Sequence, residues 1–191
     1  NNTDINTRTA WYSKSVTGET SIGGSKGFDN PENDDGSWSG VPLNFPIIQG
    51  ADCCGEIVAV GDDINVERIG ERVLVRTMQQ HAVDYKPFEC WTVGSECNGA
   101  FAQYMVAFSD ESYKIESDWS DIELGSIPCA YSTAENLLER SNVSKGETVL
   151  ITGSSGGVGS AAIQLAKRRG ATIIAVASEQ KITDVKSIGA D

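Results

Sequence analysis

A glycine-rich turn between an apolar run and a helical pattern is the strongest constraint on this chain. Residues 148–159 read TVLITGSSGGVG, and residues 160–170 read SAAIQLAKRRG. The first turn of a helix carries backbone N–H groups without intrahelical partners and the positive end of the helix dipole. Glycines let this backbone approach a phosphate closely, because they carry no side chains. The segment is therefore predicted to bind the diphosphate of a dinucleotide.

The surrounding pattern supports this interpretation. Apolar residues 149–151 predict a buried strand, a helical stripe follows, and Gly170 is the expected helix cap. A second apolar run at 172–177 completes a strand–helix–strand unit, which is the context that the G-x-G-x-x-G fingerprint requires. The alternative is an ordinary tight turn of an α/β protein. The fingerprint holds Ser154 at its first glycine position, and we expect cofactor contacts from Gly153, Ser154, Ser155, Gly156, Gly157, Val158 and Gly159.

The end of the second apolar run bears on which nicotinamide cofactor is bound. An Asp or Glu at this point binds the ribose 2′-hydroxyl of NAD and repels a 2′-phosphate. This chain has Ser178 there, followed by Glu179, Gln180 and Lys181. A small hydroxyl and a cation suit the 2′-phosphate, so NADPH is the expected cofactor and NADH is the alternative. For Lys181 itself, the alternative is a solvated residue in the first turn of a helix.

The composition limits the class of partner. Of 191 residues, 39% are hydrophobic and 22% are charged, which is typical of a globular protein. No apolar run reaches the roughly 20 residues that cross a bilayer. The net charge of −12 argues against nucleic acid or an anionic membrane as a partner. Five cysteines without regular spacing favour a reducing compartment, so a cytoplasmic location is expected.

Two modules follow one another, and both ends of the chain look interrupted. Residues 41–115 read as short strands separated by turns, with strands expected at 55–60, 73–75 and 100–108. The chain opens on NNTDINTRT without a methionine and stops where a third strand of a dinucleotide fold is expected. We therefore expect a fragment that lacks the start of its first domain and most of its second.

Helical patterns and a polar segment complete the expected organisation. Ser120 and Glu123 form a capping box, and Pro128 is expected to break or kink the helix that begins there. A second helical stripe follows at 134–140. The polar residues 17–40 are expected to form a long loop, either a surface insertion or a substrate lid.

With these pieces in order, the sequence resembles the medium-chain dehydrogenase/reductase superfamily. The resemblance implies an α/β plus β fold, with a GroES-like β-barrel-type domain at 1–120 and a partial, doubly wound Rossmann domain at 121–191. The loop GSSGGVG looks like that of the quinone oxidoreductase and enoyl reductase branches, and a homodimer is expected for the full-length protein. The matching segments are FPIIQGADCCGEIVAVG (45–61), IGERVLV (69–75), GAFAQYMV (99–106), CAYSTAENLLER (129–140) and GETVLITGSSGGVGSAAIQLAKRRGA (146–171).

The best-known members of this superfamily bind zinc, and a catalytic zinc takes three protein ligands. By resemblance, the first two ligand positions fall on Asn1 and Ala51, and only the third, Cys129, keeps a metal-binding side chain. Cys53 and Cys54 are adjacent, so in an extended segment they point to opposite faces and cannot both reach one ion. We expect them to be buried, inert thiols, and we expect no metal.

Without a metal, ordinary side chains must supply the acid and the electrostatic stabilisation. By resemblance, Asn1 lies near the nicotinamide and is expected to hydrogen-bond a substrate oxygen. Tyr12 falls where the enoyl thioester reductases carry a proton-donating tyrosine, and the alternative is a packing residue beside Trp11. Thr133 is expected to contact the nicotinamide, with a helix-capping hydroxyl as the alternative.

Together these observations favour a zinc-independent, NADPH-dependent oxidoreductase. Its small-molecule substrate would be a quinone or a carbon–carbon double bond conjugated to a carbonyl. One rival is a zinc alcohol dehydrogenase with relocated ligands, such as Cys129 with Asp52. Another is a non-enzymatic structural or regulatory protein that binds NADPH, with the loops at 17–40 and 76–98 as candidate partner surfaces.

Overall fold

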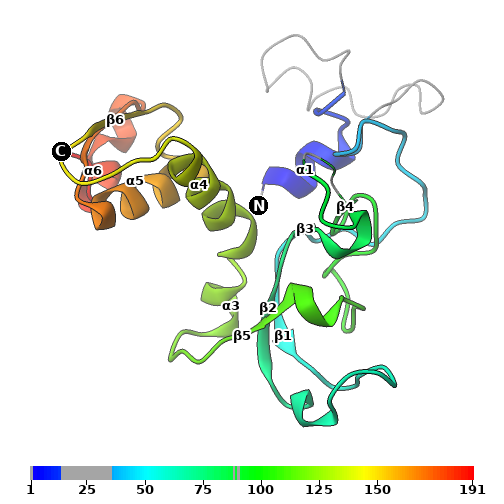
Figure 1. Cartoon of the computed structure of the whole chain (residues 1–191). Helices are drawn as coiled ribbons and strands as arrows, with labels where there is room; N and C mark the ends of the chain where they lie inside the picture. The colour runs from blue at the N-terminus through cyan, green and yellow to red at the C-terminus, as the bar shows by residue number, and fades with distance from the viewer. Residues whose placement is uncertain (1, 14–35, 88, 90) are drawn as a thin grey trace. The chain divides into compact units, whose positions relative to one another are not determined.

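The computed structural model describes residues 2–13, 36–87, 89 and 91–191. The chain forms two compact units, Asn1–Pro128 and Cys129–Asp191 (Figure 1). The first unit is rich in β-structure, and the second contains a parallel strand pair with helices. Most of the polar segment at 17–40 lies outside the described residues, so its role as an insertion or a lid stays a prediction.

A three-stranded antiparallel sheet forms the centre of the first unit. Its order is β1 (Cys53–Glu56), β2 (Arg72–Val75) and β5 (Ser112–Lys114), with β2 in the middle. Val73 and Val75 are two residues apart on β2, so their side chains lie on the same face of the sheet, and both are buried. Their β-branched side chains also favour a strand. The strand predicted at 73–75 is therefore confirmed.

Short elements surround this sheet. A ribbon pairs β3 (Met78–Gln79) with β4 (Trp91–Thr92), and helix α1 (Asn2–Arg8) precedes them. Three single turns of 3₁₀ helix lie in the connections, namely η2 (Val66–Arg68), η3 (His81–Val83) and η4 (Ser109–Glu111).

Two arginine side chains form hydrogen bonds between segments of the first unit that are far apart in the sequence. The Arg68 guanidinium donates to the carbonyls of Ser109 and Ser112, both at 2.7 Å. Arg72 donates through Nε to the carboxylate of Asp121 at 2.7 Å. A guanidinium carries five donors in a fixed fork, so one side chain can hold several loop groups at once.

The strand expected at 55–60 is only partly present, and the strand expected at 100–108 is absent. β1 ends at Glu56, and none of residues 100–108 is in a strand, although all of them are described. The side chains of Val58 and Val106 are 57% and 95% exposed. A strand is stabilised by a neighbour that pairs its backbone groups. Among the described residues, the last backbone N–H of this segment to pair in this way before residue 108 is that of Phe101, which donates to the Gln49 carbonyl at 2.9 Å.

Helix α3 (Asp121–Leu124) explains why the first unit extends beyond the expected boundary at residue 120. The predicted capping box is present: Ser120 Oγ accepts from the Glu123 N–H, and the Glu123 carboxylate accepts from the Ser120 N–H at 2.8 Å. Leu124 is buried, and α3 packs against β1. Pro128 starts the next helix, α4 (Pro128–Arg140), at a position where its missing N–H costs no hydrogen bond.

The second unit is a parallel strand–helix–strand unit. β6 (Thr148–Ile151) pairs with β7 (Thr172–Ala175), and α5 (Gly157–Arg169) connects them. Gly170 ends α5 in the left-handed conformation at φ 82°, as predicted. The hydrophobic core of this unit contains Ala134, Leu138, Ile151, Ala161, Ala162, Ile163, Ala166, Ala171, Ile173 and Val185.

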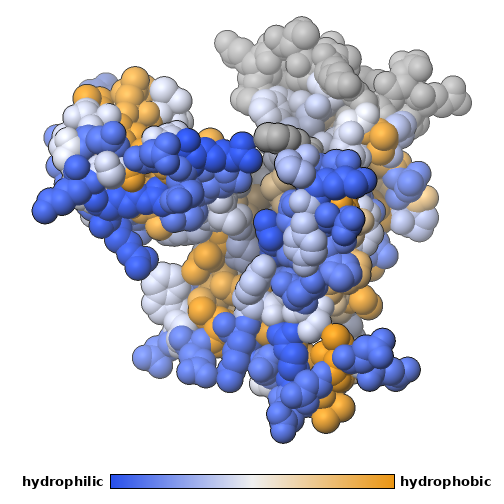
Figure 2. Space-filling view, viewed as in Figure 1, coloured by the Kyte–Doolittle hydropathy of each residue, from blue (hydrophilic) through white to orange (hydrophobic). Residues whose placement is uncertain are grey.

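The other face of the strand pair is open. Leu150 and Ile174 are 62% and 52% exposed, since alternate side chains of a strand face opposite sides. Figure 2 shows hydrophobic residues at the surface of this part of the chain. The turn η5 (Glu179–Lys181) and helix α6 (Ile182–Ser187) follow β7. Within the described residues, every helix is too short or too polar to span a membrane.

Candidate dinucleotide-binding site

The loop between β6 and α5 builds the candidate site from backbone atoms. Gly153 has a φ of 59°, a conformation that favours glycine, and its carbonyl accepts a hydrogen bond from the Gly156 N–H at 3.0 Å. Gly156 lies at the N-cap of α5 with φ −80° and ψ 171°, and its position has no side-chain cap. The turn therefore leaves the start of the helix open.

Gly159 fits its place because it has no side chain. A Cβ there would lie 2.3 Å from the Gly153 carbonyl oxygen and 2.6 Å from the Ser154 Cα. Both are backbone atoms, so they could not rotate away. The close approach of helix and loop is the role that the third glycine has in the fingerprint.

The mouth of this loop presents hydrogen-bond donors. The first N–H groups of α5, from Gly157 to Gly159, lack intrahelical acceptors by helix geometry. Ser155, Gly156 and Gly157 are exposed, and the first turn contains no acidic side chain. The last turn of α5 is basic, which complements the dipole at the opposite end. An anion at the start of α5 would therefore meet free donors and a favourable dipole.

Ser154 differs from its neighbours in the loop. It is fully buried, and its Oγ donates to the Val176 carbonyl at 2.8 Å. Ser154 was expected among the cofactor contacts, but its side chain points into the protein and stabilises the loop through this hydrogen bond.

The residues expected at the cofactor's 2′ position lie on the turn after β7. Ser178 is exposed at the start of η5, and its carbonyl accepts from the Lys181 N–H at 2.8 Å. Lys181 Nζ lies 3.2 Å from Asp184 Oδ2, and both side chains are more than half exposed. An exposed pair of this kind is worth about 0–1 kcal/mol, so a 2′-phosphate could compete for the ammonium group.

Thr133 lies inside α4 and not at its N-cap. Its Oγ1 donates to the Cys129 carbonyl at 2.7 Å, one helical turn earlier. This bond uses the hydroxyl proton, while the oxygen can still accept one from a ligand. Thr133 therefore does not cap the helix, and its contact with the nicotinamide stays a prediction.

Tyr12 belongs to an aromatic cluster in the first unit. Its ring centroid lies 5.2 Å from that of Trp11 and 4.5 Å from that of Trp38. This packing agrees with the alternative in which Tyr12 is a packing residue. The ring is half-buried, and proton donation by its hydroxyl stays a prediction. Asn1, the other expected catalytic residue, lies outside the described residues.

Asp4 has a role that the sequence did not reveal. This buried carboxylate accepts the N–H groups of Gly50 and Ala51 through Oδ1, at 3.0 and 2.9 Å. Thr77 Oγ1 holds the same turn by donating to the Ala51 carbonyl at 3.0 Å. Asp4 therefore ties helix α1 to the turn that carries Ala51. The only signal in the sequence was the acid itself, because its partners lie 46 and 47 residues away.

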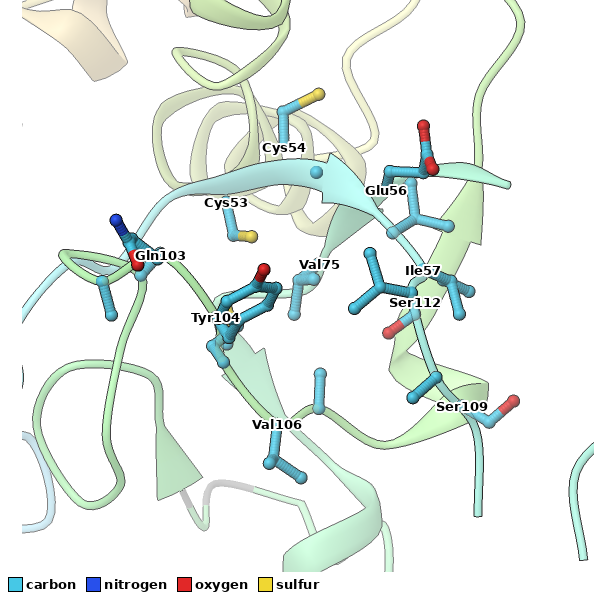
Figure 3. A pocket seen from close by; sticks show the side chains of 18 of the residues that line it. Cys53, Cys54, Glu56, Ile57, Val75, Gln103, Tyr104, Val106, Ser109 and Ser112 are labelled. Carbon is cyan, nitrogen blue, oxygen red and sulfur yellow. The ribbon is translucent and has the colours of Figure 1, made fainter. Parts of the chain in front are cut away.

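The resemblance places zinc-ligand positions at Asn1, Ala51 and Cys129, of which Asn1 lies outside the described residues. Ala51 offers only a buried methyl group. Cys53 and Cys54 lie on opposite sides of β1, as predicted (Figure 3). Both thiols are partly exposed, so the expectation that they are buried is wrong. Burial, although partial, is the main cause that raises the pKa of each above its ordinary value. No group of three His, Cys, Asp or Glu side chains in the described parts of the chain could hold a metal ion.

The first unit also contains an apolar cavity of 840 Å³. It lies between the stretch that continues β1 and the segment 100–107, where strands were expected. Figure 3 shows Cys53 directed toward Tyr104 across this space. Its lining also contains polar side chains, among them Glu56, Gln103 and Tyr104.

Comparison with known proteins agrees with this architecture. Residues 19–117 match the family model of the alcohol dehydrogenase GroES-like domain. A solved structure assigned as an alcohol dehydrogenase from Sinorhizobium meliloti 1021 superposes with a TM-score of 0.80 at 39% identity, over 100% of this chain and 49% of that one.

Two curated relatives are reductases by name. Acryloyl-coenzyme A reductase of Metallosphaera sedula is 30% identical over 152 residues, which cover 75% of this chain and 46% of the relative. The chloroplastic quinone-oxidoreductase homolog of Spinacia oleracea is 32% identical over 157 residues, which cover 79% and 43%. The chain thus spans about half the length of these relatives. With a family match over half its length and two curated relatives at 30% identity or more, the chain belongs to the medium-chain dehydrogenase/reductase family of oxidoreductases.

Proposed function

We propose that this chain is part of a zinc-independent, NADPH-dependent oxidoreductase. The enzyme would reduce a quinone or a carbon–carbon double bond conjugated to a carbonyl. The second unit would be the first part of a Rossmann domain. We further propose that the whole protein is a cytoplasmic homodimer.

The observation that carries this proposal is the geometry of the glycine-rich loop. The first N–H groups of α5 open on an exposed turn, and the contact of Gly159 with Gly153 fixes that turn in place. A rigid set of donors suits a diphosphate, because little order has to be gained on binding.

The substrate class is supported by relatives with related chemistry. The names of the Metallosphaera and spinach relatives refer to an acryloyl thioester and to a quinone. Both are conjugated carbonyl compounds that accept a hydride at carbon or oxygen. The bound nicotinamide would supply that hydride, and the protein must supply a proton.

The protein's own residues would position the reactants. The α5 donors would hold the diphosphate, and the Ser178 turn would receive the 2′-phosphate. Tyr12 is the proposed proton donor, and Asn1 is proposed to bind the carbonyl oxygen of the substrate. Asp4 supports the proposed role of Tyr12, because it anchors the helix that leads to Tyr12.

Binding of the diphosphate can be tested at Ser155, which is exposed in the loop. Ser155→Asp places a negative charge beside the diphosphate and is expected to weaken NADPH binding about tenfold or more. Ser155→Asn has nearly the same shape without the charge, and is expected to retain binding. Titration of the full-length protein by calorimetry measures both. Equal affinities for NADPH in the two variants would contradict the proposed site.

Turnover can be tested with a panel of quinones, enals and enoyl thioesters, with NADPH oxidation as the readout. Tyr12→Phe should lower kcat by about 100-fold or more if the phenol donates the proton, since general acids contribute on that scale. An unchanged kcat would leave Tyr12 a packing residue. Binding of NADPH without turnover of any substrate would favour the non-enzymatic alternative.

A zinc alcohol dehydrogenase is the second candidate. The Sinorhizobium structure is described as an alcohol dehydrogenase, and a similar alcohol dehydrogenase from Pyrobaculum aerophilum is described as bound to cobalt and zinc. Cys129 could contribute one ligand to it. Metal analysis of the full-length protein distinguishes the two candidates. One zinc per chain, together with loss of alcohol oxidation on chelation, would support this candidate and overturn the zinc-free proposal.

A further inference from the structure

The peptide group of Val176 is held from both sides in the second unit. Its N–H donates to the Ile151 carbonyl at 2.8 Å, beyond the last pair of the β6–β7 ladder. Its carbonyl accepts two hydrogen bonds from Ser154, one from the N–H at 3.2 Å and one from Oγ at 2.8 Å. The hydroxyl bond joins residues 22 positions apart, and Ser154, which donates it, is fully buried.

These bonds connect the two parts of the proposed cofactor site. On one side, Ser154 is part of the loop that faces the diphosphate, and Gly159 packs against its Cα. On the other side, Val176 lies two residues before Ser178, where the 2′-phosphate is expected. A glycine at position 154, as in the fingerprint, would keep the backbone bond and lose the hydroxyl bond. The hydroxyl is therefore an additional link between the diphosphate loop and the Ser178 turn.

We propose that Ser154 is a positioning residue for cofactor selection, which sets the place of the Ser178 turn relative to the diphosphate loop. This inference rests on the proposed function, because it assumes that both parts contact one dinucleotide. It also assigns Ser154 a different role from its exposed neighbour Ser155. Ser155 faces the ligand, whereas Ser154 acts through Val176.

The test compares dissociation constants for NADPH and NADH in the full-length protein. Ser154→Ala removes only the hydroxyl bond and is expected to lower the preference for NADPH about fivefold, the factor that corresponds to a net hydrogen bond of about 1 kcal/mol. Ser155→Ala is the matched control, since any effect it has should change both constants by the same factor. A residue with a merely structural role would weaken both cofactors equally. An unchanged ratio in Ser154→Ala would therefore overturn the inference.

A double-mutant cycle with Ser178→Ala gives an independent readout. If Ser154 acts through the Ser178 turn, the effects of the two substitutions on NADPH binding should not add. Additive effects would contradict the inference. Ser154→Cys, which has a slightly larger side chain and a weaker donor, serves as the second variant if Ser154→Ala does not fold.

Failure of the proposed function gives a different result. A folded, unaltered protein that binds neither NADPH nor NADH would refute the dinucleotide site itself. Binding of both cofactors with a ratio that does not respond to Ser154→Ala would refute only the role of Ser154.

Discussion

Replacing Gly159 by alanine tests whether the loop and helix α5 are packed as tightly as the structure shows. The new methyl group would lie 2.3 Å from the Gly153 oxygen and 2.6 Å from the Ser154 Cα. Overpacking costs about 1–3 kcal/mol, and backbone neighbours place this site at the upper end. Alanine recovers about 1 kcal/mol through its helix propensity. The net loss is about 2 kcal/mol, which lowers the thermal midpoint by roughly 4–8 °C for a chain of this size.

Gly157 provides a matched control on the same helix. A methyl group there would lie 3.7 Å from the Ala130 Cβ, an ordinary contact. Gly157→Ala should therefore raise stability by up to about 1 kcal/mol, because alanine loses less conformational freedom on folding. Thermal unfolding followed by circular dichroism measures both variants without cofactor. Equal midpoints for the two variants, or an unchanged midpoint in Gly159→Ala, would refute the packing argument.

Three further predictions concern the first unit. Asp4→Ala leaves two buried N–H groups without an acceptor, so it should cost about 1–3 kcal/mol in urea unfolding, and a loss below the error of the measurement would contradict the clamp. The hydrogen bond to Asp110 raises the pKa of Tyr85 to about 12, so its stabilising effect is complete below about pH 10 and is lost as the pH rises through 12. In an absorbance titration, Asp110→Asn should return this pKa toward about 10, and Tyr85→Phe identifies the signal. Burial raises the pKa of Cys97 to about 11, so its alkylation, followed by peptide mapping, should be slow at pH 7 and accelerate up to pH 11; rapid reaction at neutral pH would contradict this.

Features with local causes could be predicted from the sequence. The capping box at Ser120, the left-handed cap at Gly170 and the turn at Gly153 all depend on residues within one or two turns of the chain. The strand–helix–strand order of the second unit follows from the same kind of local pattern. For this reason the local structure of the glycine-rich loop between β6 and α5 is the part of the candidate site that the sequence predicted best, while its binding of a diphosphate stays a prediction.

Features that depend on distant partners were missed. The segment 100–108 has the apolar and aromatic composition of a strand, but most of its length is without a pairing neighbour among the described residues. The burial of Ser154 and the clamp made by Asp4 depend on groups 22 and 46 residues away. The local sequence pattern gives no information on such contacts, so these buried hydrogen bonds could be identified only in the folded structure.

The clamp at Asp4 also bears on how the first unit opens. Helix α1 contains seven residues, fewer than a helix needs to persist alone in water. Its order must therefore come from tertiary contacts, which include the hydrogen bonds of Asp4 to the turn at Gly50 and the burial of Thr7. Hydrogen exchange should show the amides of α1 and of this turn opening together, as one small cooperative segment with a single free energy. The rigidity of the segment that leads to Tyr12 would then depend on the Asp4 clamp as well as on the packing of Tyr12 against Trp11 and Trp38.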